Sequence, residues 1–190
     1  MKVCIVAEGC YPYVVGGVSG WINSMIKSFP NIEFILLTIV ANRSVRGKFV
    51  YELPENLTQV YELYLEDCEW EEGERERKVR KRFHLSKKER TELTNLVMNR
   101  KIEWGVIFDL FQRKGVSVDD LLMGADFFQI VRECYKRQYA NIVFSDFLWT
   151  MRSIYLPLFW TLKMKVPQAD LYHCVATGYA GVLGSMAKVS

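Results

Sequence analysis

The apolar positions of this chain follow two periods in alternation, which predicts strands connected by helices. Residues 3–7 form a short continuous apolar run, which is typical of a strand buried on both faces. Residues 32–40 form a second run, rich in β-favouring side chains. Between them, apolar side chains recur three and four positions apart, which predicts a helix over residues 18–29. The side chains expected on its buried face are Val18, Trp21, Ile22, Met25, Ile26 and Phe29.

These segments form a β-α-β unit, which should cross over right-handed and bind ligands at the carboxyl edge of its strands. The stretch EGCYPYVVGGVSGW, residues 8–21, would lie at that edge. Because Gly16 and Gly17 lack a Cβ atom, a ligand can approach their backbone N–H groups, and the helix N-terminus favours an anion there. We therefore predict a diphosphate site at Gly16, Gly17 and Val18. A plain structural turn stays open as an alternative, because the spacing matches neither standard nucleotide-binding fingerprint.

The end of the chain repeats this pattern of strand, turn and helix. Residues 169–176 predict a strand, Thr177 and Gly178 a turn, and residues 179–188 a helix. His173 would lie near the carboxyl end of the strand, where sites in α/β proteins gather. Thr177 could cap the helix and help to hold an anion. A purely structural role for His173 stays open on the pattern alone.

The middle of the chain is predicted to be a strand over residues 58–65 followed by helices. Residues 66–90 are first acidic and then basic, with eight Lys or Arg and one acid between positions 77 and 90. This basic run favours a solvated helix face, with an anionic lipid or a charged partner as the alternative. We interpret residues 70–139 as a helical insertion.

Several helices are expected in and after that insertion. Ser86 and Glu89 match a capping box that begins one helix, and a short helix is expected over residues 107–111. Another should run from Ser117 to about residue 139. The next covers residues 145–162, with Ser145 as its N-cap.

The helix over residues 145–162 contains two residues, Pro157 and Arg152, whose surroundings can be predicted. Pro157 is expected to end or kink it. Arg152 lies in an apolar segment and needs a partner, which would be Asp146 or a substrate anion.

Composition supports one α/β domain over residues 1–190, with a parallel sheet covered by helices on both faces. Half of the 190 residues are apolar, enough for one sizeable core. Five scattered cysteines without a C-x-x-C pair, and only two histidines, favour free thiols in a reducing compartment and no metal site. The net charge of +3 gives no case for nucleic acid. No signal peptide or membrane-spanning run is apparent, which predicts a cytoplasmic location.

Three stretches carry a resemblance to a known family: residues 8–21, residues 145–158 (SDFLWTMRSIYLPL) and residues 169–188 (ADLYHCVATGYAGVLGSMAK). Together they resemble the N-terminal half of the PelF-like bacterial exopolysaccharide glycosyltransferases, retaining enzymes of the GT-B fold. The resemblance runs over essentially the whole chain. It implies a Rossmann-like, acceptor-side domain that is truncated and inactive alone. The second domain of such enzymes, which binds the nucleotide sugar and carries a Glu-x7-Glu motif, is expected to be absent from this chain.

The resemblance also implies a reaction. It would be metal-independent and cofactor-free transfer of a sugar, with retention, from a nucleotide diphosphosugar such as a UDP-sugar to a growing exopolysaccharide. A location at the inner membrane, with a polysaccharide export complex, is implied as well. Asp170 to His173 match a D-x-x-H strand end that faces the donor sugar, which makes His173 the catalytic candidate. The residues expected in the cleft or on the acceptor side are Glu8, Tyr11, Tyr13, Ser19, Arg152, Thr177, Gly178 and Tyr179.

Two other functions compete with this interpretation. One is a non-catalytic module that binds polysaccharide or assembles a membrane complex. The other, a dinucleotide-binding domain, is weaker because the glycine fingerprint does not match.

Overall fold

A computed structural model describes residues 1–68 and 84–189, which fall into two compact units. One unit contains residues 1–69 and 164–190, and the other contains residues 70–163. The first holds the whole sheet and the second is helical, so the helical part extends beyond the expected boundary near residue 139.

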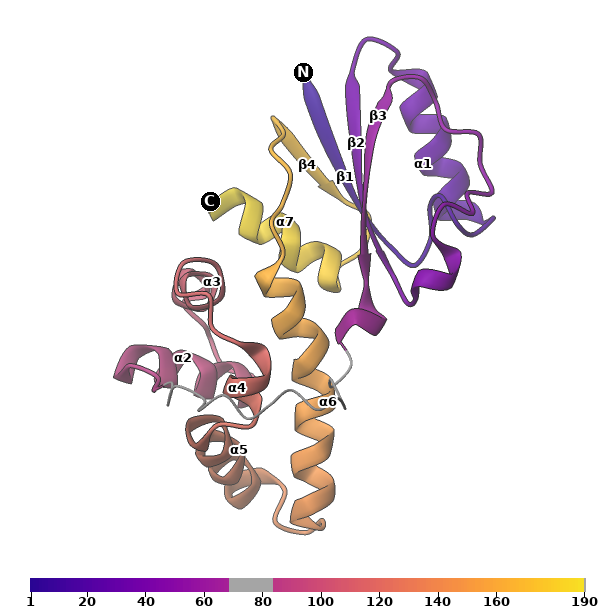
Figure 1. The fold of residues 1–190 in the computed structure, drawn as a ribbon. Helices are drawn as coiled ribbons and strands as arrows, with labels where there is room; N and C mark the ends of the chain where they lie inside the picture. The colour runs from indigo at the N-terminus through magenta and orange to yellow at the C-terminus, as the bar shows by residue number, and fades with distance from the viewer. Residues whose placement is uncertain (69–83, 190) are drawn as a thin grey trace, which may run out of the picture. The chain divides into compact units, whose positions relative to one another are not determined.

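The sheet has four parallel strands in the order β3-β2-β1-β4 (Figure 1). The strands are β1 (Lys2–Glu8), β2 (Glu33–Val40), β3 (Leu57–Tyr64) and β4 (Leu171–Cys174). From β1 the chain moves outward to β2 and β3, and it later returns to the opposite side of β1 to form β4. The order therefore reverses between β1 and β4, and ligands of open α/β sheets bind outside the carboxyl ends at such a switch point.

Helices cover both faces of this sheet, as its continuous apolar strands require. Helices α1 (Gly17–Ser28) and α7 (Tyr179–Val189) lie on opposite faces (Figure 1). Ile22 and Ile26 of α1 pack in one core cluster with alternate residues of β1 and β2, while α7 contacts β1 and β4. Two short 3₁₀ helices, Arg43–Val45 and Leu65–Cys68, flank β3. The predicted α/β class with a parallel sheet is confirmed.

The buried face of α1 differs from the predicted one. Val18, Trp21 and Phe29 are about half exposed, whereas Ser19 is 1% exposed and lies in the interior with Ile22. The buried stripe is therefore narrower than the apolar pattern suggested, and it consists of Ser19, Ile22 and Ile26, of which the two isoleucines pack in one cluster with residues of the sheet. Trp21 lies outside this buried stripe.

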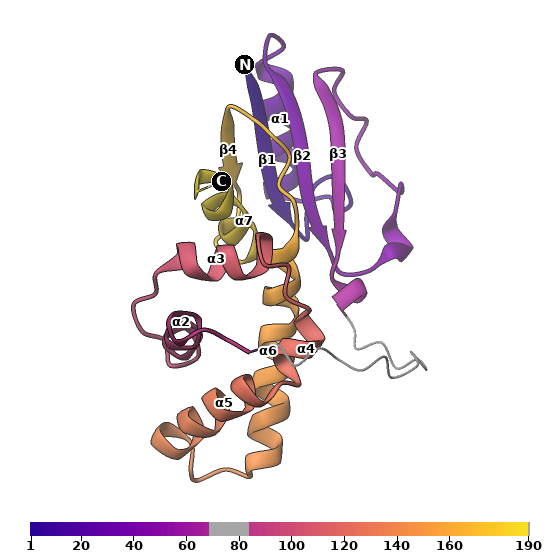
Figure 2. The same cartoon turned by 60° about the vertical axis from the view of Figure 1, so that its left-hand side comes forward.

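The helical unit contains α2 (Lys87–Val97), α3 (Trp104–Gln112), α4 (Val118–Leu122), α5 (Ala125–Gln138) and α6 (Phe144–Lys163), as Figure 2 shows. The predicted capping box is present at α2, with Ser86 and Glu89 bonding each other's backbone N–H groups. Helix α6 packs against α3, α4 and α5. Its Tyr155 and Phe159 form an aromatic cluster with Phe127, and Phe159 also contacts Phe111.

Three expectations about this unit were wrong. The single helix expected after Ser117 is two, because the backbone of Gly124 is extended (φ -74°, ψ 157°) and interrupts the helical run; a Cβ atom there would lie 2.7 Å from the carbonyl oxygen of Asp120. Ser145 is not the N-cap of α6, which already begins at Phe144. Of the two effects expected of Pro157, an end or a kink, the end was wrong, since α6 continues for more than a turn beyond it.

Only the second half of the basic run lies in the described residues. Positions 77–83 fall outside them. In the remainder, Lys88 pairs with Glu103 at 2.7 Å, and Arg90 pairs with Asp126 at 3.4 Å and bonds Gln129. Lys88 and Arg90 therefore make ion pairs with neighbouring helices, as expected of a solvated helix face.

Candidate functional site at the carboxyl edge of the sheet

A pocket of ≈ 370 Å³ opens beside the switch point of the sheet. Its lining comes from the first turns of α1 and from the end of β4, and consists of Gly17, Val18, Trp21, His173, Cys174 and Val175. Because β1 and β4 are neighbours, the glycine loop that follows β1 lies beside the last residues of β4. The pocket thus brings together Gly17, Val18 and His173, which the sequence analysis had singled out from opposite ends of the chain.

The N-terminus of α1 is open to an anion. Gly16 is the N-cap, and within the described residues no side chain makes a capping hydrogen bond there. The first intrahelical bond is donated by Gly20 to the carbonyl of Gly16, so the N–H groups of residues 17–19 have no intrahelical acceptor. No acidic residue lies in this first turn. Apart from adjacent residues and the nearby backbone of α1 itself, no described atom lies within 4 Å of a Cβ atom built on Gly16 or Gly17, which leaves space against the backbone.

The N-terminus of α7, by contrast, is already occupied. Glu8, the last residue of β1, accepts a hydrogen bond from the backbone nitrogen of Ala180 at 3.3 Å. A Cβ atom at Gly178 would lie 2.8 Å from the same carboxylate oxygen of Glu8. The protein's own carboxylate therefore takes the place that a bound anion would take at α7. Thr177 is exposed on the turn before it, and Tyr179 is the first residue of the helix.

His173 has an aromatic neighbour that the sequence analysis assigned to the core. Its imidazole lies 5.5 Å from the Trp21 ring, centroid to centroid, with 37° between the planes. Trp21 comes four residues after Gly17, so the two lie on the same side of α1, one turn apart. The four-residue spacing between Gly17 and Trp21 could have indicated that Trp21 belongs to the site. The sequence pattern instead led us to expect Trp21 on the buried face of the helix.

Tyr11 and Tyr13 shape the glycine loop from inside rather than from the pocket. Tyr11 is fully buried against the ring of Tyr51 at 5.3 Å, and burial, with Tyr51 nearby, raises its pKa to about 12. Tyr13 is 8% exposed and donates a hydrogen bond to Glu62 on β3. Ser19 is equally inaccessible, as described above. These three predicted cleft residues therefore have structural positions.

Asp170 lies at the other end of the sheet from His173. Its carboxylate accepts a hydrogen bond from the backbone nitrogen of Lys2 at 2.7 Å, and its own N–H bonds the carbonyl of Lys2. It therefore holds the starts of β1 and β4 together. Of the D-x-x-H pattern, only His173 reaches the carboxyl edge.

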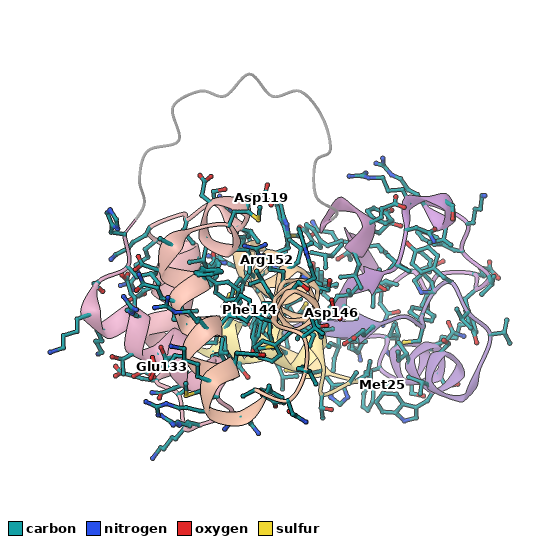
Figure 3. The ribbon with its side chains drawn as sticks, turned by 90° about the horizontal axis from the view of Figure 1, so that it is seen from below. Met25, Asp119, Glu133, Phe144, Asp146 and Arg152 are labelled. Atoms are coloured by element: carbon teal, nitrogen blue, oxygen red, sulfur yellow. The ribbon has the colours of Figure 1, made fainter. Side chains whose placement is uncertain are left out.

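Arg152 belongs to the helical unit, and its partners differ from those expected. It is 8% exposed, its Nε donates to the carbonyl of Leu122 at 3.2 Å, and its guanidinium lies 5.1 Å from the ring centre of Trp149. Figure 3 labels Arg152 and Asp146, and within the described residues no ion pair joins them. Six positions apart on α6, they lie on different sides of the helix. Burial lowers the pKa of Arg152.

The described residues also lack two other kinds of feature. None of the helices there is long and apolar enough to cross a membrane. No three potential metal-ligating side chains among His, Cys, Asp and Glu come together there.

The fold and the switch-point pocket define a Rossmann-like α/β domain. The chain belongs to the family described as "Domain of unknown function (DUF3492)", whose model matches residues 1–190. Comparisons with curated proteins and with solved structures gave no match.

Proposed function

We propose that this chain is the N-terminal, acceptor-side domain of a retaining GT-B glycosyltransferase of the PelF-like type. It would help to transfer a sugar from a nucleotide diphosphosugar, a UDP-sugar, to a growing exopolysaccharide. A second Rossmann-like domain would bind the nucleotide across a cleft, and a polysaccharide export complex at the inner membrane would be the setting. The family is in general associated with the N-terminal regions of glycosyltransferases, which supports this assignment.

The observation that carries the proposal is that Gly17 and His173 line one pocket at the switch point of the sheet. An open helix N-terminus with accessible glycines suits a diphosphate, because its N–H groups and dipole favour negative charge. His173, on the neighbouring strand, would contact the group attached to that diphosphate.

In the proposed reaction an acceptor hydroxyl oxygen forms a bond to the anomeric carbon while the bond from that carbon to the diphosphate breaks. Negative charge develops on the departing diphosphate, which takes up the hydroxyl proton. The N–H groups of Gly17 and Val18 would stabilise that charge electrostatically. His173 would donate a hydrogen bond to the donor sugar and orient it. Glu8 would act indirectly, by keeping α7 in place beside β4 and by leaving α1 as the helix that receives the phosphate.

Calorimetric titration of UDP into the protein at its natural full length tests the proposal, with Gly17→Val as the variant. We expect the valine side chain to fill the space the phosphate needs and to weaken UDP binding by at least about tenfold. Because a Cβ atom at Gly17 meets open space, the thermal midpoint should not change. Gly20→Val is the matched control, since Gly20 is a turn onward, has equally open surroundings and does not line the pocket. Equal UDP affinity in Gly17→Val and its parent would reject the diphosphate site.

A second candidate function, polysaccharide binding without transfer, is favoured by the half-exposed Trp21 in the same pocket. It predicts binding of oligosaccharide without any affinity for UDP. The same titrations, with oligosaccharide added to the panel, separate the two functions.

A further inference from the structure

Trp21 is exposed in a way that its role in folding does not require. It is 49% exposed, although α1 buries Ser19, Ile22 and Ile26 on its inner side. Large aromatic rings contribute most when they are buried, and exposed ones beside a concave surface mark binding sites. Trp21 lies beside such a surface, since it lines the pocket with Gly17 and His173.

The neighbours of Trp21 make this part of the pocket amphipathic. The indole offers an apolar ring, Val18 and Val175 add aliphatic surface, and the imidazole of His173 adds hydrogen-bonding nitrogens at a ring distance of 5.5 Å. A pyranose matches this combination, because one face carries only C–H groups while hydroxyls surround its rim. The C–H groups are weakly positive and are attracted to the negative face of an aromatic ring.

The position of Trp21 along α1 favours the sugar over the nucleobase. Gly17 and Trp21 are one helical turn apart, about 5–6 Å. A sugar is bonded directly to the terminal phosphate of the donor and can span that distance. The base is separated from the same phosphate by a second phosphate and a ribose, which place it farther away.

We propose that Trp21 is the stacking platform for the sugar ring of the donor and, with His173, a specificity-determining residue for that sugar. This inference rests on the proposed function, because it takes the diphosphate to lie at Gly17. It goes beyond it by assigning recognition of the sugar, separately from the diphosphate, to the Trp21 ring.

Calorimetry on the full-length protein tests the assignment with UDP, UDP-glucose, UDP-galactose and UDP-N-acetylglucosamine. In the parent, at least one UDP-sugar should bind more tightly than UDP. Trp21→Ala should weaken binding of that sugar nucleotide by roughly 3- to 10-fold and leave UDP unchanged. Trp21→Phe, which keeps an aromatic face, should retain most of the affinity. Phe29→Ala is the matched control, because Phe29 is an equally exposed aromatic residue at the other end of α1.

The outcomes separate this inference from the proposed function. Loss of UDP and UDP-sugar affinity by the same factor in Trp21→Ala would overturn the sugar platform and indicate stacking on the base or a structural role. It is also overturned if no UDP-sugar in the panel binds better than UDP, or if Trp21→Ala changes neither affinity. In each case UDP binding that depends on Gly17 would leave the proposed function standing. A parent that binds none of the four ligands would reject the proposed function itself.

Discussion

The carboxylate of Glu8 and the backbone nitrogen of Ala180 lie 3.3 Å apart, so the last residue of β1 supplies the acceptor for the first turn of α7. The two helices that begin beside the switch point are therefore not equivalent. A phosphate at α7 would have to displace Glu8 and overcome its negative charge, whereas among the described residues no side chain caps α1 and its first turn holds no acidic residue. This asymmetry is why the diphosphate is proposed at the glycine pair.

The contact between Glu8 and Gly178 should be visible in stability. Gly178→Ala puts a Cβ atom 2.8 Å from the Glu8 carboxylate, which must then shift and weaken its hydrogen bond to the N-terminus of α7. We expect the free energy of unfolding in urea to fall by about 1–2 kcal/mol. Gly181→Ala is the control on the same helix, because its Cβ atom would make an ordinary 3.6 Å contact. In a Glu8→Ala background the cost of Gly178→Ala should largely disappear, and an equal cost in both backgrounds would contradict the contact.

Gly16→Asp should separate folding from ligand binding. The backbone of Gly16 is extended, with φ 178° and ψ 174°, and a Cβ atom there meets open space. An aspartate would cap the N–H groups of α1, so the free energy of unfolding should rise by a few tenths of a kcal/mol. The same carboxylate would occupy and repel the anion site, so UDP affinity should fall. Paired denaturation and calorimetry measure the two effects, and tighter UDP binding would argue against an anion site at α1.

Glu89 should give the helical unit a measurable acid sensitivity. It is 5% exposed, and although burial alone would raise its pKa, hydrogen bonds from Lys114 and Ser86 outweigh burial and lower it. A carboxyl whose pKa is lower in the folded state stabilises the fold above its unfolded pKa of about 4.3, and that stability is lost as pH falls through the folded pKa. Glu89→Gln should therefore cost about 1–3 kcal/mol at pH 7 and flatten the acid side of the stability profile. Glu103→Gln, in the exposed pair with Lys88, should leave the profile unchanged, and a parent-like profile for Glu89→Gln would refute the assignment.

Asn56 should prove important for the junction between α1 and the sheet. Its amide nitrogen donates to the carbonyls of Ile26, Phe29 and Ile32 at 2.9–3.2 Å. Asn56→Ala should lower the free energy of unfolding by about 1–2 kcal/mol, because these carbonyls lose their donor. Asn56→Asp has the same shape but cannot donate when ionised, and it repels the carbonyls. It should cost at least as much as the alanine variant at pH 7, and a milder effect would show that shape rather than donation matters.

Local patterns in the sequence predicted most of the elements. The apolar runs located β1 and β2, and the final helix begins at residue 179 as predicted. The capping box at Ser86 was also predicted correctly, because both of its hydrogen bonds join residues within a four-residue stretch. The divided helix at Gly124 was missed, because apolar side chains recur at helical spacing on both sides of it, and that period does not show that the backbone of Gly124 is extended.

By itself, the sequence determined the alternation of strands and helices, the parallel sheet and the candidates Gly17, Val18 and His173, because burial on two faces and backbone access leave a local signature. The tertiary structure decided which candidates meet. It brought Trp21 to His173, turned Tyr11 and Ser19 inward, and took Asp170 to the opposite edge of the sheet. It also decided that Glu8 fills the N-terminus of α7. These outcomes depend on strand order and on contacts between residues far apart in the chain, which a local pattern cannot specify.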